Sequence, residues 1–213
     1  MDFAEAQKEA LGCTKCGLCH SRTRVVFGDG PLNAELFVVG EAPGFNEDRE
    51  GKPFGGASGM LLDRLLSSAG FSRDSVYLTT LVKCKPPDSP PRAPKPSEVS
   101  ACRPYLLAQL AAVDPKVVLA MGDLASRVLT GRKEAVSRIR GRAVPLDGRY
   151  VLPTLGLVRA LYTPADRALL LSDFSRLPEL VETDRPSTYE TLNVPRAPGR
   201  AGAEREPLQP GLW

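Results

Sequence analysis

The chain has 213 residues, 42% of them hydrophobic and 25% charged, which is enough for one compact domain with a real core. No apolar stretch approaches the roughly 20 residues that a membrane span requires, and the first residues lack the order of a signal peptide. We therefore expect a cytoplasmic, monomeric protein without a membrane partner, and the net charge of +3 does not by itself indicate any class of ligand.

Four short apolar runs predict the strands of a parallel sheet, since each is bounded by Gly, Pro or charged residues. They cover residues 35–40, 76–82, 117–122 and 149–155. Helical patterns alternate with them and cover residues 58–70, 96–113, 123–131 and 164–182. The alternation predicts an α/β fold, a three-layer αβα sandwich around a four-stranded parallel sheet.

Composition divides the chain after residue 182. Residues 1–182 carry the strand and helix patterns, whereas residues 183–213 are rich in Pro, Gly, Arg and Glu. The second segment has too little apolar surface to offset the entropy of ordering it, so we predict a disordered tail. A second Pro-rich stretch, residues 85–98, contains six prolines and predicts a stiff exposed loop.

A glycine-rich stretch with embedded carboxylates follows the first predicted strand. It reads GEAPGFNEDREGKPFGGASG and covers residues 40–59. In open α/β sheets, ligands bind beyond the carboxyl ends of the strands. This stretch is therefore the first candidate for a binding site.

The cysteines favour a metal site over disulfide bonds in a cytoplasmic chain. Cys13 and Cys16 form a CxxC pair, Cys84 ends the second predicted strand, and Cys102 lies in a predicted helix. Four thiolates from these distant segments can surround tetrahedral zinc or a 4Fe-4S cluster, and spacing alone does not separate the two.

Two alternatives stay open for the cysteines. Cys84 and Cys102 can be ordinary buried small side chains, with only the N-terminal pair binding anything. His20, the single histidine of the chain, can complete a zinc site together with Cys13, Cys16 and Cys19.

Five stretches together resemble the iron-sulfur uracil-DNA glycosylases of family 4, over about residues 10–182. In chain order these are CTKCGLC with SRTRVVFGDG, VVGEAPGFNEDREGKPFGGASGMLLDRLL, VYLTTLVKCKPP, SEVSACRPYL and VVLAMG. The resemblance implies a 4Fe-4S cluster of structural role, held by Cys13, Cys16, Cys84 and Cys102. Cys19 is then an extra thiol.

The resemblance also implies a pocket for a base flipped out of DNA. Its catalytic residues are then Glu41, Ala42 and Glu47. Its base-binding residues are Gly40, Phe54 and Thr80. The residue types fit, because an aromatic face stacks on a base and carboxylates stabilise the positive charge of a breaking glycosidic bond. Taken alone, Phe54 also fits a core aromatic, and the glutamates fit helix caps.

Two positions depart from the family pattern. Family members have Thr-Asn at the end of the second strand, where this chain has Thr79 and Thr80. They also have a histidine after the last strand, a position that falls on Gly156 or, by another alignment, on Thr163. We therefore expect slow excision or an altered lesion.

The partner implied is DNA that contains uracil or another damaged base. The residues expected to face this DNA are Arg138, Arg140, Gly156 and Arg159, together with the Pro-rich loop. Two other functions stay open: a non-catalytic iron-sulfur protein that binds damaged or single-stranded DNA, and a zinc-stabilised nucleotide-binding module.

Overall fold

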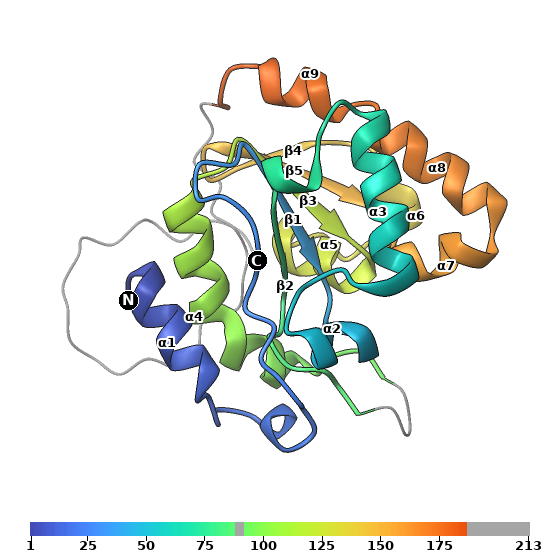
Figure 1. Ribbon diagram of the computed structural model, residues 1–213. Helices are drawn as coiled ribbons and strands as arrows, with labels where there is room; N and C mark the ends of the chain where they lie inside the picture. Colours follow the sequence, from blue (N-terminus) through green and yellow to red (C-terminus); the bar gives the residue numbers. More distant parts are fainter. Residues whose placement is uncertain (88–91, 187–213) are drawn as a thin grey trace.

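A five-stranded sheet forms the centre of the computed structural model, which describes residues 1–87 and 92–186 (Figure 1). The strand order is β2-β1-β3-β5-β4. The strands are β1 (Leu36–Gly40), β2 (Tyr77–Thr80), β3 (Val117–Met121), β4 (Val144–Leu146) and β5 (Arg149–Thr154). The first three and β5 are parallel, at the four places that the sequence predicts. The predicted αβα fold is thus confirmed.

The fifth strand corrects the predicted strand count. β4 pairs antiparallel with β5 at the edge of the sheet. The two strands are joined by Asp147 and Gly148, which have φ angles of 50° and 70°. A two-residue turn with positive φ at both positions matches the right-handed twist of a hairpin, and Asp-Gly is a favoured sequence for it.

Helices cover both faces of the sheet (Figure 1). One face packs against α3 (Gly56–Ser68), α7 (Leu157–Tyr162), α8 (Pro164–Phe174) and α9 (Leu177–Glu182). The other packs against α4 (Pro96–Val113) and α5 (Asp123–Thr130), and α1 (Phe3–Leu11) lies on α4. Two short helices, α2 (Phe45–Glu50) and α6 (Val136–Ile139), complete the α-helices of the described residues. Side chains alternate along β1, so Leu36 and Val38 face one layer and Phe37 and Val39 the other.

The helix predicted over residues 164–182 is two helices, and this prediction is corrected. α8 ends at Phe174 and α9 begins at Leu177. Pro178 has no N–H to donate to the carbonyl of Phe174, so one continuous helix would lose that hydrogen bond. Along α8, Leu170 and Phe174 are buried, whereas Leu169 is 40% exposed.

Four of the described α-helices lie in segments without a predicted helix. These are α1, α6, α2 inside the glycine-rich stretch, and α7 in the segment after β5. In the described part of the chain, none of the helices is both long and apolar enough to cross a membrane. Residues 88–91 of the Pro-rich loop and most of the predicted tail, residues 187–213, lie outside the described residues.

Candidate active site

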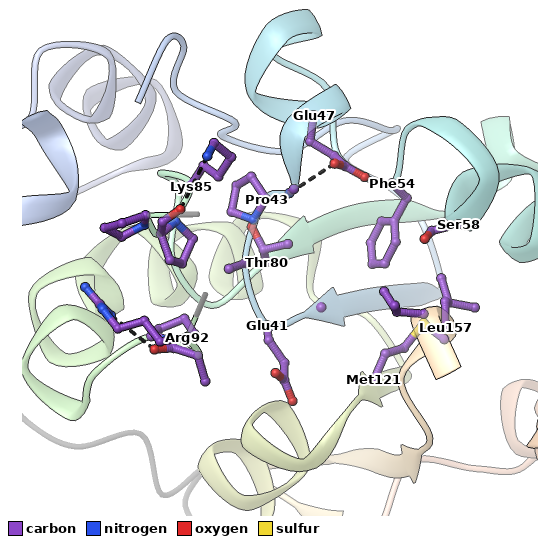
Figure 2. A pocket seen from close by; sticks show the side chains of 18 residues that line it. Glu41, Pro43, Glu47, Phe54, Ser58, Thr80, Lys85, Arg92, Met121 and Leu157 are labelled. Carbon is purple, nitrogen blue, oxygen red and sulfur yellow. Dashed lines mark hydrogen bonds between the residues drawn. The ribbon is translucent and has the colours of Figure 1, made fainter. Parts of the chain in front are cut away.

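A cavity of about 820 Å³ opens where three parallel strands end (Figure 2). Gly40, Thr80 and Met121 are the last residues of β1, β2 and β3, and all three line it. This is the edge of the sheet at which parallel α/β folds bind ligands. The fold thus places a cavity where the glycine-rich stretch was expected to make a site.

All six residues predicted for catalysis and base binding line this cavity. They are Gly40, Glu41, Ala42, Glu47, Phe54 and Thr80. Figure 2 shows Phe54 beside Ser58 on one side and Arg92 on the other side. The structure therefore brings these residues together, while the role of each stays a prediction.

The ring of Phe54 lies close to the last residue of β1. A Cβ atom at Gly40 would lie 3.1 Å from Cζ of Phe54 and 3.3 Å from Cγ2 of Thr80. The missing side chain at Gly40 therefore makes room for the ring. Phe54 packs against the core with one part of its surface and lines the cavity with another.

Glu47 holds the glycine-rich stretch in place. Its Oε2 accepts a hydrogen bond from the N–H of Gly44 at 3.0 Å, and its Oε1 accepts one from the N–H of Gly55 at 2.9 Å. One carboxylate thus joins the loop after β1 to the segment that carries Phe54. Hydrogen bonds from N–H groups to an ionised carboxylate are stronger than those between neutral groups.

Glu41 points toward the start of α5 (Figure 2). Its Oε1 accepts a hydrogen bond from the N–H of Leu124 at 2.8 Å. Gly122 has a φ of 100°, and a Cβ atom there would overlap the Glu41 carboxylate, so this approach requires glycine. Burial raises the pKa of the Glu41 carboxyl above its ordinary value of 4.5, against the lowering effect of the Leu124 hydrogen bond.

Thr80 is buried, and its hydroxyl proton already takes part in a hydrogen bond within the protein. Oγ1 donates to the carbonyl of Val82 at 2.8 Å. The remaining capacity of this hydroxyl is therefore that of an acceptor. Behind it, the buried amine of Lys83 donates to the carbonyl of Thr80 at 2.7 Å, and burial lowers the pKa of this amine to about 7.

Four cysteines from three segments of the chain pack at one buried cluster beside the cavity. Cys84 and Cys102 belong to one buried cluster, and Cys13 and Cys16 pack against it, as does Ala42 from the cavity. This juxtaposition is unlike two isolated buried thiols. It also links the cysteine region directly to the glycine-rich loop.

Three of these sulfur atoms accept hydrogen bonds. Arg22 Nη1 donates to Cys84 Sγ at 3.3 Å, and the N–H of Lys83 donates to Cys102 Sγ at 3.4 Å. The N–H of Lys15 donates to Cys13 Sγ at 3.5 Å. Donors directed at sulfur favour the thiolate, the form in which cysteine binds metals. Burial has the larger effect here and raises the pKa of the Cys84 thiol, and that of the Cys102 thiol to about 11.

A single metal ion does not fit the cysteine region as it stands. Within residues 1–87 and 92–186, no three His, Cys, Asp or Glu side chains converge closely enough to hold one ion. His20, the alternative zinc ligand, is exposed.

The residues expected to face DNA lie in different environments. Gly156 directly precedes Leu157 and Val158, which line the cavity. Arg159 is exposed and its Nε lies 3.1 Å from Asp166 Oδ2. Arg138 is also exposed, on α6, and is not among the described residues that line the cavity.

Arg140 is engaged inside the protein. Its Nε and Nη2 donate to the carboxylate of buried Asp173 at 3.0 and 2.6 Å, and Nη2 also donates to the carbonyl of Leu169. Thr154 Oγ1 donates to the same carboxylate at 2.6 Å. Arg140 would have to leave these partners in order to contact a phosphate.

Several residues of the cavity wall come from segments that were predicted to face DNA and not to line the base pocket. The Pro-rich loop contributes Arg92, whose guanidinium donates to both carboxylate oxygens of Glu98 at 2.8 and 2.7 Å. Leu157 and Val158 come from α7. The six prolines restrict the backbone of this loop, so the sequence predicts a stiff loop. The sequence does not predict that the loop lines the cavity.

Comparisons with known proteins agree with this geometry. Residues 27–179 match the family model described as the Uracil DNA glycosylase superfamily. The chain is 43% identical to a "Type-4 uracil-DNA glycosylase" of Thermotoga maritima, over 67% of this chain and 74% of the relative. It is 36% identical to proteins of that name from Sulfurisphaera tokodaii, over 89% and 90% of the two chains, and from Archaeoglobus fulgidus, over 87% and 96%. The chain therefore belongs to the uracil-DNA glycosylase superfamily and, within it, to the type-4 family.

Proposed function

We propose that this protein is a DNA glycosylase that hydrolyses the N-glycosidic bond of uracil, or of a related damaged base, after the base has swung out of DNA. The observation that carries this proposal is the cavity at the strand ends, in a chain of the type-4 family. Phe54, Gly40 and Thr80 supply one wall of it. An aromatic face and an open strand end suit a flat ligand, which an extruded base is.

The carboxylates have separate tasks in this proposal. Glu47, with both oxygens bound to backbone N–H groups, keeps the loop in shape. Glu41 supplies negative charge near the sugar, where the glycosidic carbon becomes positive as its bond breaks. It can also orient the attacking water. The carboxyl must be ionised for both tasks, so its raised pKa makes it responsive to acid pH.

Excision should be slow, because the family histidine has no counterpart at Gly156. Removing a donor aimed at developing negative charge costs about 2.7 to 4 kcal/mol, or two to three powers of ten in rate. The described residues beside Gly156 that line the cavity are apolar, namely Leu157 and Val158. Their side chains exclude water but donate no hydrogen bond to the departing base.

Base selection should also differ from that of a site with asparagine. The hydroxyl of Thr80 donates to Val82, so it presents an acceptor to the cavity. An acceptor matches the ring N–H of uracil, hypoxanthine or xanthine. It donates no hydrogen bond to a carbonyl oxygen of the base, whereas the amide N–H of an asparagine side chain would.

A 4Fe-4S cluster held by Cys13, Cys16, Cys84 and Cys102 is part of the proposal. The support is their meeting at one buried cluster and the hydrogen bonds to three of the sulfurs. The cluster would tie the N-terminal segment, the end of β2 and α4 together beside the cavity. Brown colour of the purified protein with broad visible absorption supports iron and sulfur, whereas a colourless, zinc-containing protein refutes the cluster.

DNA contacts would come from the exposed arginines. Arg138 and Arg159 can reach solvent and so can pair with phosphates, which supplies affinity without sequence preference. Such binding should weaken steeply as salt concentration rises.

The test of the proposed function is a panel of lesions. The protein is incubated with oligonucleotides that contain uracil, hypoxanthine or xanthine, single-stranded and in duplex, and alkali then cleaves any abasic site. A cleaved strand from at least one lesion, absent with Glu41→Gln, supports the proposal. DNA binding without any cleavage would instead favour the second candidate, a non-catalytic protein that binds damaged DNA, to which Thr80 and Gly156 point.

A further inference from the structure

Phe54 has an unusual backbone conformation. Its φ is 54°, in the left-handed region. That region is sterically unfavourable for a bulky aromatic residue, because Cβ approaches the following carbonyl oxygen. Such a conformation persists only where the surroundings impose it, and it is common at ligand-binding sites. The surroundings of Phe54 must therefore contain groups that hold it.

Arg73 is the principal group of this kind. Its Nη2 donates to the carbonyl of Pro53 at 2.7 Å and to the carbonyl of Phe54 at 3.0 Å. A guanidinium presents several N–H donors in a fixed plane, so it can fix two successive carbonyls at once. Arg73 lies 20 residues from Pro53 along the chain, in the short turn η2 (Arg73–Ser75) before β2.

Asp63 fixes Arg73 in turn. Arg73 Nη1 donates to Asp63 Oδ1 at 2.9 Å, and the two side chains are 30% and 44% exposed. Asp63 lies on α3, the helix that begins two residues after Phe54. The helix, the turn and the segment of Phe54 thus form one hydrogen-bonded unit.

Two neighbours restrict the same peptide further. A Cβ atom at Gly59 would overlap the carbonyl oxygen of Phe54, so the first turn of α3 comes into direct contact with that carbonyl. On the next residue, the N–H of Gly55 donates to Glu47. The peptide after Phe54 is therefore held at its oxygen by Arg73 and at its N–H by Glu47.

We propose that Arg73, oriented by Asp63, is a positioning residue that holds Phe54 in its left-handed conformation and so aims the ring into the cavity. Arg73 is not among the described residues that line the cavity, so it acts through Phe54 and not on the base itself. The inference rests on the proposed stacking of Phe54 on the flipped base. Arg73 would then influence the affinity for the damaged base from a position outside the cavity.

A double-mutant cycle tests this role. The dissociation constant is measured for a duplex that carries 2′-fluoro-2′-deoxyuridine, whose glycosidic bond resists hydrolysis, with the wild type, Arg73→Met, Phe54→Ala and the double variant. Phe54→Ala should weaken binding roughly 5- to 150-fold, the range expected for losing one base stack. Arg73→Met should weaken it roughly 3- to 10-fold in the wild type, and less than about twofold when Phe54 is already alanine.

Further variants separate positioning from a loss of fold or charge. Arg73→Lys keeps the charge and some of the donors, so it should fall between the wild type and Arg73→Met. Arg64→Met removes an exposed arginine beside Asp63 on α3 and should show no coupling to Phe54. Should Arg73→Met fail to fold, Asp63→Asn replaces it in the cycle and should give a smaller loss that also vanishes without Phe54.

The outcomes distinguish this inference from the proposed function. If Arg73→Met weakens DNA binding equally with phenylalanine and with alanine at position 54, the positioning role of Arg73 is overturned, and the stacking role of Phe54 stands. Unchanged affinity in Phe54→Ala would overturn the stacking role, and the positioning role with it. A loss confined to the background that retains Phe54 supports both.

Discussion

The two walls of the cavity differ in kind. The loop wall, formed by residues 40–44 and Phe54, follows the family pattern and is fixed by N–H groups that donate to Glu47 and by the guanidinium of Arg73, which donates to the carbonyl of Phe54. The helix wall, formed by Leu157 and Val158 after Gly156, departs from that pattern and is apolar. In the proposed function the first wall holds the flat base, and the second lacks the histidine side chain that would stabilise its departure. Substitutions in the loop wall should therefore change the affinity for the damaged base, and substitutions in the helix wall should change the rate of its excision.

Adding a donor to the helix wall should have the largest effect. Gly156→His places an imidazole at the family position, and single-turnover release of uracil should rise at least tenfold, toward a ceiling of about 100- to 1,000-fold. The position accepts a side chain, because φ is −72° and a Cβ atom would meet only Cα of Gly122, at 3.7 Å. The measurement is the rate of abasic-site formation with enzyme in excess.

Thr163→His is the matched control for that gain. Thr163 precedes α8 and is not among the described residues that line the cavity. Its replacement should leave the rate within about twofold of the wild type. A gain at Thr163 and none at Gly156 would contradict the comparison of the two walls.

Removing a cysteine should destabilise the support of the loop wall. Cys102→Ala should abolish visible absorption and lower the unfolding midpoint by about 6 to 12 °C, which corresponds to about 3 kcal/mol in a domain of this size. Cys19→Ala should keep both properties, since Cys19 lies outside the proposed ligand set. Retained absorption in Cys102→Ala would show that this thiol is not a ligand.

Removing the acceptor at the end of β2 should have a moderate effect. Thr80→Val deletes the hydroxyl, leaves the shape nearly unchanged, and should lower kcat/KM for uracil about fivefold, the equivalent of one hydrogen bond of about 1 kcal/mol. Thr80→Ser retains the hydroxyl and should stay close to the wild type. Equal losses in both variants would assign the effect to packing and not to the acceptor.

The smallest predicted effect concerns the pH dependence of stability. Burial raises the pKa of Glu41, so the folded state binds its proton more tightly than the unfolded state does. The stability that this proton binding contributes is present below the ordinary pKa of 4.5 and is lost as pH rises through the raised value. Relative to Glu41→Gln, the wild type should lose unfolding free energy from pH 4 to pH 7, and a constant difference would contradict it.

The sequence predicts the parallel strands and the loop wall because their signals are local. Apolar runs mark the strands, and the glycine-rich stretch follows one of them directly. The same reading missed the hairpin strand β4, although its Asp147-Gly148 turn was present, because only three residues pair. It also missed Arg73, since its partners Pro53 and Phe54 are distant in sequence and accept through backbone carbonyls that any residue has.

In the proposed function, a binding wall of the glycosylase type works without the histidine that family members carry after the last strand. The most direct test is the single-turnover rate of uracil release from a uracil-containing duplex, compared with that of the type-4 relative from Thermotoga maritima under the same conditions. We predict an abasic product that forms about 100 to 1,000 times more slowly than with the relative. A rate equal to that of the relative, or no product with DNA binding retained, would contradict this account.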